Sequence, residues 1–189
     1  MDILTAILGG FGLAAPAGLN AWLPLLIVGL AGRINVIQLH EPYNTLSNTW
    51  VLVALCVLLF IEIMADKIPA VDSVNDVIHT FIRPAAGAIL FAAQNDAIGG
   101  LPPALALILG LVAAGSVHAV KASVRPVVTV TTGGMGNPLI SILEDVIAAV
   151  STILALIVPL VAGVLFLVFL VAVVRLVLRW RRRRVAARL

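Results

Sequence analysis

The chain has 189 residues, of which 62% are hydrophobic and only 11% charged, and its mean hydropathy is +1.17. Soluble domains are about 45–50% apolar and about 25% charged, and a chain of this length has too little interior to bury such an excess. Composition therefore excludes a soluble globular domain and a disordered chain, and Cys56, the one cysteine, allows no internal disulfide. We predict an all-α, polytopic membrane helical bundle with about six crossings of roughly 20 residues each.

The first apolar run, residues 3–31, is punctuated by glycines and by Pro16 and Pro24. Such residues weaken a helix, and in lipid a break survives only where protein or a cavity receives the freed backbone groups. We therefore expect an interrupted helix, with Asn20 just past the break.

The next segments alternate between polar and apolar. A polar loop at 33–49 precedes a predicted helix at 50–65. Residues 66–83 are polar, with a short helix expected after Asp72. Residues 84–93 are apolar but too few to span a bilayer, so this crossing must borrow residues upstream.

In the second half, residues 94–100 predict a turn, and the prolines at 102 and 103 suit the start of a helix that runs to about 119. Residues 126–136 are rich in glycine and read as extended. Asn137, followed by proline, then predicts the start of a helix. The long apolar run at 146–174 predicts a span that includes Pro159.

Basic residues gather at the C-terminal end. Of the twelve Lys and Arg, seven lie in residues 175–189, directly after an apolar run. This pattern predicts one transmembrane domain, 1–178, and an Arg-rich cytoplasmic tail, 179–189, that contacts anionic headgroups. Trp180 is the one aromatic residue there, so we expect no nucleic acid partner.

The other basic residues predict a topology. Counting about six crossings back from a cytoplasmic C-terminus puts Lys67, Arg83, Lys121 and Arg125 inside and only Arg33 outside. The N-terminus then also lies inside, and it lacks the basic stretch of a cleaved signal peptide. We expect a multi-pass protein of the bacterial cytoplasmic (inner) membrane with both termini cytoplasmic.

Residues 79–84 (HTFIRP) resemble residues 121–126 (KASVRP), and each follows an apolar stretch. The match indicates either an internal, inverted repeat, which is common in transporters, or a chance similarity.

Glu62 and Asp66 are four residues apart and so share one face of the predicted helix at 50–65. Glu62 follows a dozen apolar residues, and an ionisable group within lipid is a candidate functional residue. The two acids can take up protons or a cation. Equally, they can form structural pairs with Lys67, Arg83 or Arg125 that lock helices together.

Asp72, Asp76, His79 and Arg83 recur at helical spacing and share one stripe. That stripe suits a divalent metal or a proton relay. The alternative is a helix cap at Asp72 and a polar face at the membrane interface. No Cys/His spacing of a structural zinc site is present, and the identity of any metal stays open.

Two further features lie nearer the C-terminus. Glu144 and Asp145 predict either a turn between the last two crossings or a second acidic site facing Glu62. The glycines at 133, 134 and 136, before Asn137, expose backbone amides at a helix start, which suits an anion near basic side chains.

Three stretches carry a family resemblance: GLNAWLPLL (18–26), ADKIPAVDSVNDVIHTFIRPAAGA (65–88), and VKASVRP (120–126) paired with GNPLISILEDV (136–146). Together they resemble a family of small bacterial and plant membrane proteins described as domain of unknown function 4126, over about residues 5 to 170. The resemblance implies a membrane fold and location, and it transfers no activity.

We therefore expect a transporter or channel-like protein that moves a small ion or an anionic solute at a site near the middle of the membrane. The alternatives are a non-transporting accessory subunit and a lipid-handling protein. No cofactor and no enzymatic activity are expected; the expected partners are the bilayer, the solute, and a second copy or a larger membrane complex. The candidate binding residues are Asn20, Glu62, Asp66, Asp76, His79, Arg83, Arg125, Asn137 and Glu144.

Overall fold

The computed structural model describes residues 3–66, 68–98 and 101–186; the side chains of residues 69–74, 76, 95–98 and 180–186 lie outside this description. Within it the chain is helical and contains no strand, which confirms the predicted all-α class. The helices are α1 (Ile3–Ala14), α2 (Trp22–Arg33), α3 (Thr49–Ala65), α4 (Pro69–Ile98), α5 (Pro103–Thr132), α6 (Asn137–Ile157) and α7 (Pro159–Ala186), with short 3-10 helices η1 (Ala15–Gly18) and η2 (Tyr43–Ser47). Four of the described helices, α4 to α7, are long and apolar enough to cross a membrane.

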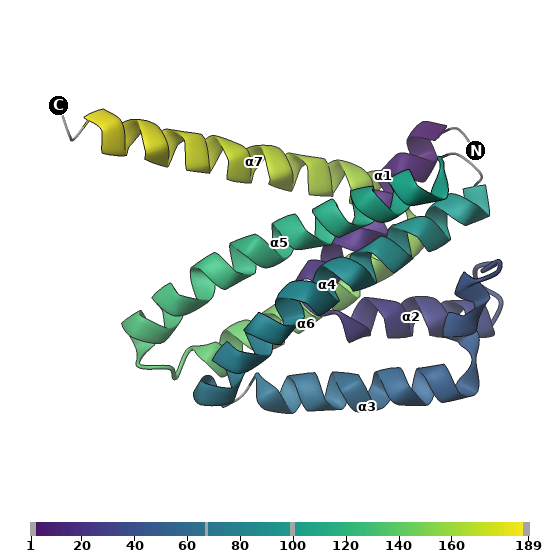
Figure 1. Cartoon of the computed structure of the whole chain (residues 1–189), viewed down its shortest axis with the longest axis horizontal. Helices are drawn as coiled ribbons and strands as arrows, with labels where there is room; N and C mark the ends of the chain where they lie inside the picture. The colour runs from purple at the N-terminus through teal and green to yellow at the C-terminus, as the bar shows by residue number, and fades with distance from the viewer. Residues whose placement is uncertain (1–2, 67, 99–100, 187–189) are drawn as a thin grey trace.

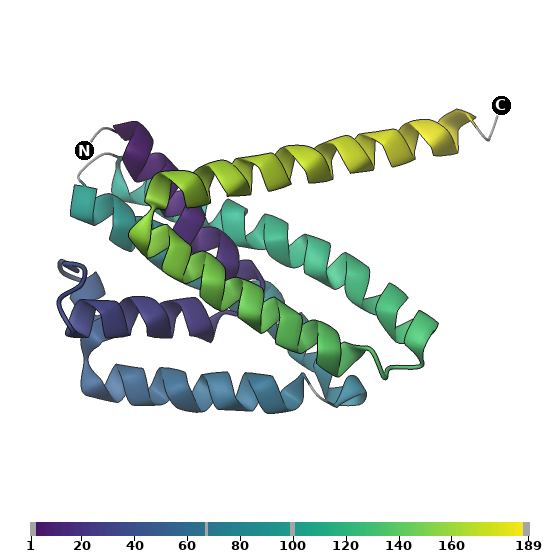
Figure 2. The same ribbon diagram turned by 180° about the vertical axis from the view of Figure 1, so that it is seen from behind.

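The first apolar segment forms a hairpin. α1 enters the bundle, the chain turns at η1, and α2 returns toward the same end of the molecule (Figures 1 and 2). Each of these helices has 12 residues and is therefore about 18 Å long, which is less than the roughly 30 Å of a hydrocarbon core. The predicted break before Asn20 is confirmed, but the chain turns back at this break.

The remaining helices run along the long axis of the molecule in alternating directions (Figure 1). The N-terminus lies at one end of that axis and the C-terminus at the other, in both views. The six apolar segments of the prediction are present. The first segment is a hairpin that starts and ends at the same end of the molecule, and the five helices α3 to α7 then bring the chain to the opposite end.

α4 and α5 are both longer than the sequence suggested. The polar residues 66–83 do not form a separate short helix, because α4 begins at Pro69 and continues through Pro84 to Ile98. It therefore includes residues 94–98 of the turn expected at 94–100. α5 likewise continues through Pro126 to Thr132, so residues 126–132 are helical and not extended. Neighbouring helices and polar side chains let a membrane helix tolerate proline.

The expected single span at 146–174 is two helices. α6 ends at Ile157, and α7 begins at Pro159. Proline lacks an N–H and disfavours a helical conformation in the residue before it, and Val158 is indeed non-helical, with φ −135° and ψ 72°. Glu144 and Asp145 consequently lie inside α6, so the turn predicted for them is wrong.

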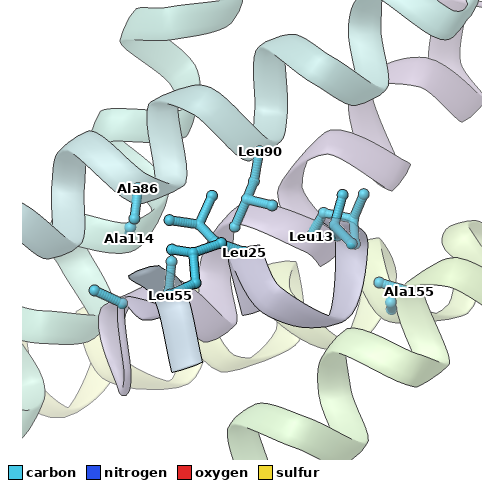
Figure 3. Packing of buried hydrophobic residues seen from close by; sticks show 11 residues of the cluster. Leu13, Leu25, Leu55, Ala86, Leu90, Ala114 and Ala155 are labelled. Atoms are coloured by element: carbon cyan, nitrogen blue, oxygen red, sulfur yellow. The ribbon is translucent and has the colours of Figure 1, made fainter. Parts of the chain in front are cut away.

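Small residues bring the helices close together. A Cβ atom added at Gly110 of α5 would collide with the backbone of α4 at Gly87, and one added at Gly163 of α7 would collide with the backbone of α1 at Leu8. Close contact through small residues is how membrane helices associate, because lipid provides no hydrophobic drive. A cluster that includes Leu13, Leu25, Leu55, Leu90 and Ala155 fills the centre (Figure 3). These contacts hold α3 to α6 close enough for their charged and polar side chains to meet inside the bundle.

Candidate functional site: a buried charge network beside a cavity

Glu62 in α3 and Asp66, the residue that caps the C-terminal end of α3, are each bound by an arginine from a different helix. Arg83 of α4 donates to Glu62 over 3.0 Å, and Arg125 of α5 lies 3.4 Å from Asp66. All four residues are at most 4% exposed. The ion pairs that the sequence allowed are therefore present, and four of the predicted site residues converge.

The two similar stretches occupy equivalent places around these acids. His79 and Arg83 both contact Glu62, at 3.5 and 3.0 Å. Lys121 and Arg125 both contact Asp66, at 3.9 and 3.4 Å. The resemblance of HTFIRP to KASVRP thus corresponds to a shared arrangement, in which a base and an arginine one helical turn later flank one carboxylate. An inverted duplication stays a prediction.

His118, which is not among the predicted binding residues, extends the Arg83 pair. Arg83 Nη1 lies 2.9 Å from His118 Nδ1, and His118 Nε2 lies 3.1 Å from the Thr80 hydroxyl. A guanidinium only donates, so His118 Nδ1 must accept and its proton must sit on Nε2. His118 is therefore neutral in this arrangement and orients Arg83 toward Glu62.

His79 has the opposite tautomer. Its Nδ1 lies 2.9 Å from the Asn75 carbonyl oxygen, which only accepts, so Nδ1 carries a proton. In the neutral ring Nε2 is then a bare lone pair, 3.5 Å from the Glu62 carboxylate. Neither His79 Nε2 nor Glu62 Oε2 has a hydrogen-bond partner among the described residues. The Glu62 oxygen near His79 Nε2 is Oε1, which also accepts from Arg83, whereas the unpartnered oxygen is Oε2. The imidazole nitrogen and the carboxylate are two neighbouring buried acceptors, and a proton bound between Nε2 and Oε1 would remove the repulsion between them.

Asn75 and Ser141 connect the two arginine pairs. The carbonyl of Asn75 binds His79, while its side-chain amide donates to Asp66 over 2.9 Å. The Ser141 hydroxyl of α6 also donates to Asp66, over 3.0 Å. Asp66 is thus held by three helices, and the network continues from α4 to α6.

Glu144 forms the far end of the network. Lys121 Nζ and Arg125 Nη2 both bind its Oε2, at 3.0 and 2.7 Å. The Glu144 side chain is 13% exposed, more than the lysine or the arginine that bind it. Glu144 shares Lys121 and Arg125 with Asp66, and not with Glu62, which it was expected to face. A second acidic site stays a prediction.

The tip of the α1–α2 hairpin is tied into this end. Lys121 Nζ donates to the Leu19 carbonyl over 2.8 Å. Asn20 accepts from the backbone amides at the start of α2 and donates to Asp145 of α6 over 2.9 Å. Backbone groups freed by the turn are therefore satisfied by buried side chains, as the membrane interior requires. Asn20, predicted as a ligand residue, caps a helix here.

Charge in the described part of the network does not balance. With His118 neutral, three fixed cations, Arg83, Lys121 and Arg125, face a larger number of carboxylates. The four carboxylates are Glu62, Asp66, Glu144 and Asp145. An uncompensated buried charge is costly, so the site favours one further proton or cation.

A cavity of about 440 Å³ adjoins Glu144 and Lys121. Its walls come from α1 with η1, from α5, from α6 and from the first half of α7. They are mainly apolar, with Phe166 and Phe169 on one side and Ser151 along α6. The charge network thus meets accessible space at its Glu144 end.

The remaining predicted residues take other places. Asn137 pairs with Thr129 across the α5–α6 turn, and the Gly136 amide is bound by Thr132, so these groups stabilise the turn. The basic side chains proposed to join an anion site there are bound to carboxylates. Asp72 and Asp76 have side chains outside the described residues. No group of three or more metal-binding side chains occurs within the described part of the chain.

The predicted binding residues did not include Lys121, His118, Asn75, Ser141 or Asp145, although Asp145 was considered beside Glu144 as part of a second acidic site. Lys121 follows a long apolar stretch of α5, which is the same signal that identified Glu62. The polar residues carry no such signal, because serine and asparagine occur on many helix faces.

The family comparison matches most of the chain. A family model described as Domain of unknown function (DUF4126) matches residues 7–179. The chain belongs to this family. No curated protein and no solved structure matches it. Membership confirms the resemblance and the membrane-like helical character of this DUF4126 protein, and it assigns no activity.

Proposed function

We propose that this DUF4126 protein is a membrane transporter that moves a small ion or solute, with the buried network as its proton- or cation-handling element. The observation that carries the proposal is the contact between a buried, charge-imbalanced network and a cavity, through Glu144 and Lys121. Ionisable side chains inside membrane helices are expensive, and in transporters they mark ion and substrate paths.

Glu62 and His79 form the element that supports proton coupling. They present two buried acceptor atoms without hydrogen-bond partners among the described residues. The charged groups around them are Arg83 on α4, Asp66 at the C-terminal cap of α3, and Lys121 on α5. A proton taken up between Glu62 and His79 removes the acceptor–acceptor contact, and its release restores the attraction between Glu62 and Arg83.

The broken hairpin supports transport as well. Short helices that meet near the middle of the membrane are typical of transporter binding sites, where helix ends point at the substrate. Here Leu19 and Asn20, at that break, are bound by side chains of the network. A change in the network therefore reaches the hairpin directly.

A non-transporting accessory subunit is the second candidate. It is favoured by the closed ion pair between Glu62 and Arg83, both nearly inaccessible to solvent. In that case the acids only lock helices, and proton movement does not depend on them.

The proposal includes a topology. The Arg-rich end of α7 and the α5–α6 turn lie at one end of the molecule (Figure 1), and the positive-inside rule assigns that end to the cytoplasm of a bacterial inner membrane. The N-terminus and the loop after Arg33 then face outward, in place of the cytoplasmic N-terminus expected from six crossings.

The test is proton uptake by proteoliposomes that contain the full chain and a trapped pH-sensitive dye, under an imposed potassium diffusion potential. We expect the wild type to acidify the lumen faster than protein-free vesicles, and Glu62→Gln to be slower by about tenfold or more. Glu41→Gln, at an exposed acid of the polar loop, is the matched control and should behave as wild type. Equal rates for wild type and Glu62→Gln would overturn proton handling by the network and favour the accessory role.

A further inference from the structure

The cavity beside Glu144 has one polar end and an otherwise apolar lining. Its volume of about 440 Å³ falls within the roughly 300–1,000 Å³ of small-molecule pockets. Lys121 and Glu144 form the polar end, and Ser151, two helical turns after Glu144 on α6, lies along the wall. This shape suits a ligand with a small polar head and an apolar body.

The hydrogen bonds at the polar end decide the character of the head. Lys121 has three N–H groups, and two oxygens lie within hydrogen-bond distance of its Nζ: Leu19 O at 2.8 Å and Glu144 Oε2 at 3.0 Å. Asp66 Oδ2, at 3.9 Å, is an ion-pair neighbour beyond hydrogen-bond distance. Glu144 uses Oε2 for both of its cations, and its Oε1 has no partner among the described residues. Glu144 thus lines the cavity with one carboxylate oxygen to spare, whereas Leu19 and Glu144 already occupy two of the three Lys121 N–H groups. The polar end therefore suits a head group that donates better than one that only accepts.

Charge gives the same answer independently. The described network holds more carboxylates than fixed cations. Glu144, at one end of the network, is more exposed than Glu62 at the other end. An anionic ligand would add to the excess, but a monocation would compensate it. The rings of Phe166 and Phe169 in the wall can accommodate an apolar body and interact favourably with a nearby cation.

We infer that this cavity binds an organic monocation, with one ammonium head bound by the Glu144 carboxylate and an apolar body between α5, α6 and α7. That this cation is a transport substrate rests on the proposed function. That the cavity binds it follows from the geometry of the cavity alone. The inference replaces the anionic solute expected from the sequence with a ligand of opposite charge.

The experiment is calorimetric titration of the purified full chain in detergent with three ligands of similar size: phenethylammonium, the neutral phenethyl alcohol and the anionic 3-phenylpropionate. We expect phenethylammonium to bind at least about tenfold more tightly than the other two, because it alone supplies a charge-assisted hydrogen bond to Glu144. Tighter binding of 3-phenylpropionate, or no binding of phenethylammonium, would overturn the inference.

Two variants locate the site. Glu144→Gln keeps the shape of the side chain and should weaken phenethylammonium binding by about tenfold while leaving the alcohol unaffected. Ser151→Leu fills the cavity without touching an ion pair and should weaken binding of all three ligands. Since the second variant leaves the network intact, it tests the site even where Glu144→Gln reduces stability; unchanged binding in Ser151→Leu would place the ligand elsewhere and overturn the inference.

The same ligand separates this inference from the proposed function. Proteoliposomes loaded with phenethylammonium should take up protons faster than unloaded ones if the bound cation is exchanged for protons. Selective binding without any such effect would leave the cation site standing and overturn transport of this cation class. Faster proton uptake without selective binding would overturn the cation site and retain proton transport.

Discussion

Arg83 is the largest side chain that the described part of the chain buries completely. Its charge is tolerated because Glu62 and His118 bind it from two sides. Removing one partner of a buried ion pair leaves an uncompensated charge, which costs about 3–5 kcal/mol, whereas replacing both partners by apolar residues costs far less. The pair therefore fixes how α3 and α4 align more than it adds stability.

Arg83→Met should accordingly lower the free energy of unfolding by about 3–5 kcal/mol. The double variant Glu62→Met/Arg83→Met should recover a large part of this loss, because no buried charge is left without a partner. The measurement is reversible unfolding in mixed detergent micelles. Arg33→Met, which removes an exposed arginine, is the control and should change stability by no more than about 1 kcal/mol. A double variant less stable than Arg83→Met alone would contradict this account.

The sequence predicted most of these residues but not their pairing. Charged residues within apolar helices stand out, and a spacing of four residues puts Glu62 with Asp66 on one face. Which arginine binds which acid depends on how α4 and α5 pack against α3, and nothing local encodes that. Residues such as Asn75 and Ser141 matter only because a neighbouring helix brings Asp66 within reach.

At the scale of helices, α4 and α5 form the closest packed pair around the network. Gly110 allows this contact, since an added Cβ would meet the backbone of α4 at Gly87 and Ala88 and the side chain of Phe91. Gly115 lies in the same helix but has room, with Pro84 atoms no nearer than 3.7 Å. The two glycines therefore offer a matched comparison.

Gly110→Ala should lower the melting temperature of the purified protein in detergent, because backbone on α4 must move to admit the methyl group. A penalty of about 1–3 kcal/mol is typical of overpacking. Gly115→Ala should leave the melting temperature unchanged or raise it, since alanine favours a helix by about 1 kcal/mol over glycine. Equal melting temperatures for the two variants would mean that α4 and α5 do not meet at Gly110.

Helix breaks were predictable only in part. The break before Asn20 was visible from dense glycine and proline, and Asn20 indeed caps the start of α2. The same kind of signal at 126–136 was misleading, because α5 passes through Pro126 and ends at Gly133, whose φ of +61° suits glycine. Whether a proline ends a membrane helix depends on neighbours that restore its lost contacts.

For the whole molecule, the decisive feature is the first segment, which turns back midway (Figure 1). A segment that turns back does not cross the membrane, so the number of crossings becomes odd in place of the even number expected. The proposed topology therefore has an outer N-terminus and a cytoplasmic C-terminus. Hydropathy alone counts apolar segments and cannot distinguish a hairpin from a crossing, which is why the sequence placed both termini together.

Impermeant maleimide labelling of intact cells tests this topology. After Cys56→Ala removes the one native cysteine, Asn44→Cys in η2 should be labelled from outside. Met135→Cys, in the exposed α5–α6 turn, should be labelled only after permeabilisation, because that turn lies at the opposite end. Labelling of both positions from one side would contradict the path of the chain described above.

The hairpin also implies an order of assembly during synthesis. Its tip is completed by Lys121, 102 residues after Leu19, and by Asp145, 125 residues after Asn20. Until α5 and α6 have emerged from the ribosome, the backbone at this turn has no partners within the bilayer, and exposing it to acyl chains is costly. The beginning of this polypeptide must therefore wait for nearly all the rest before it reaches its final depth.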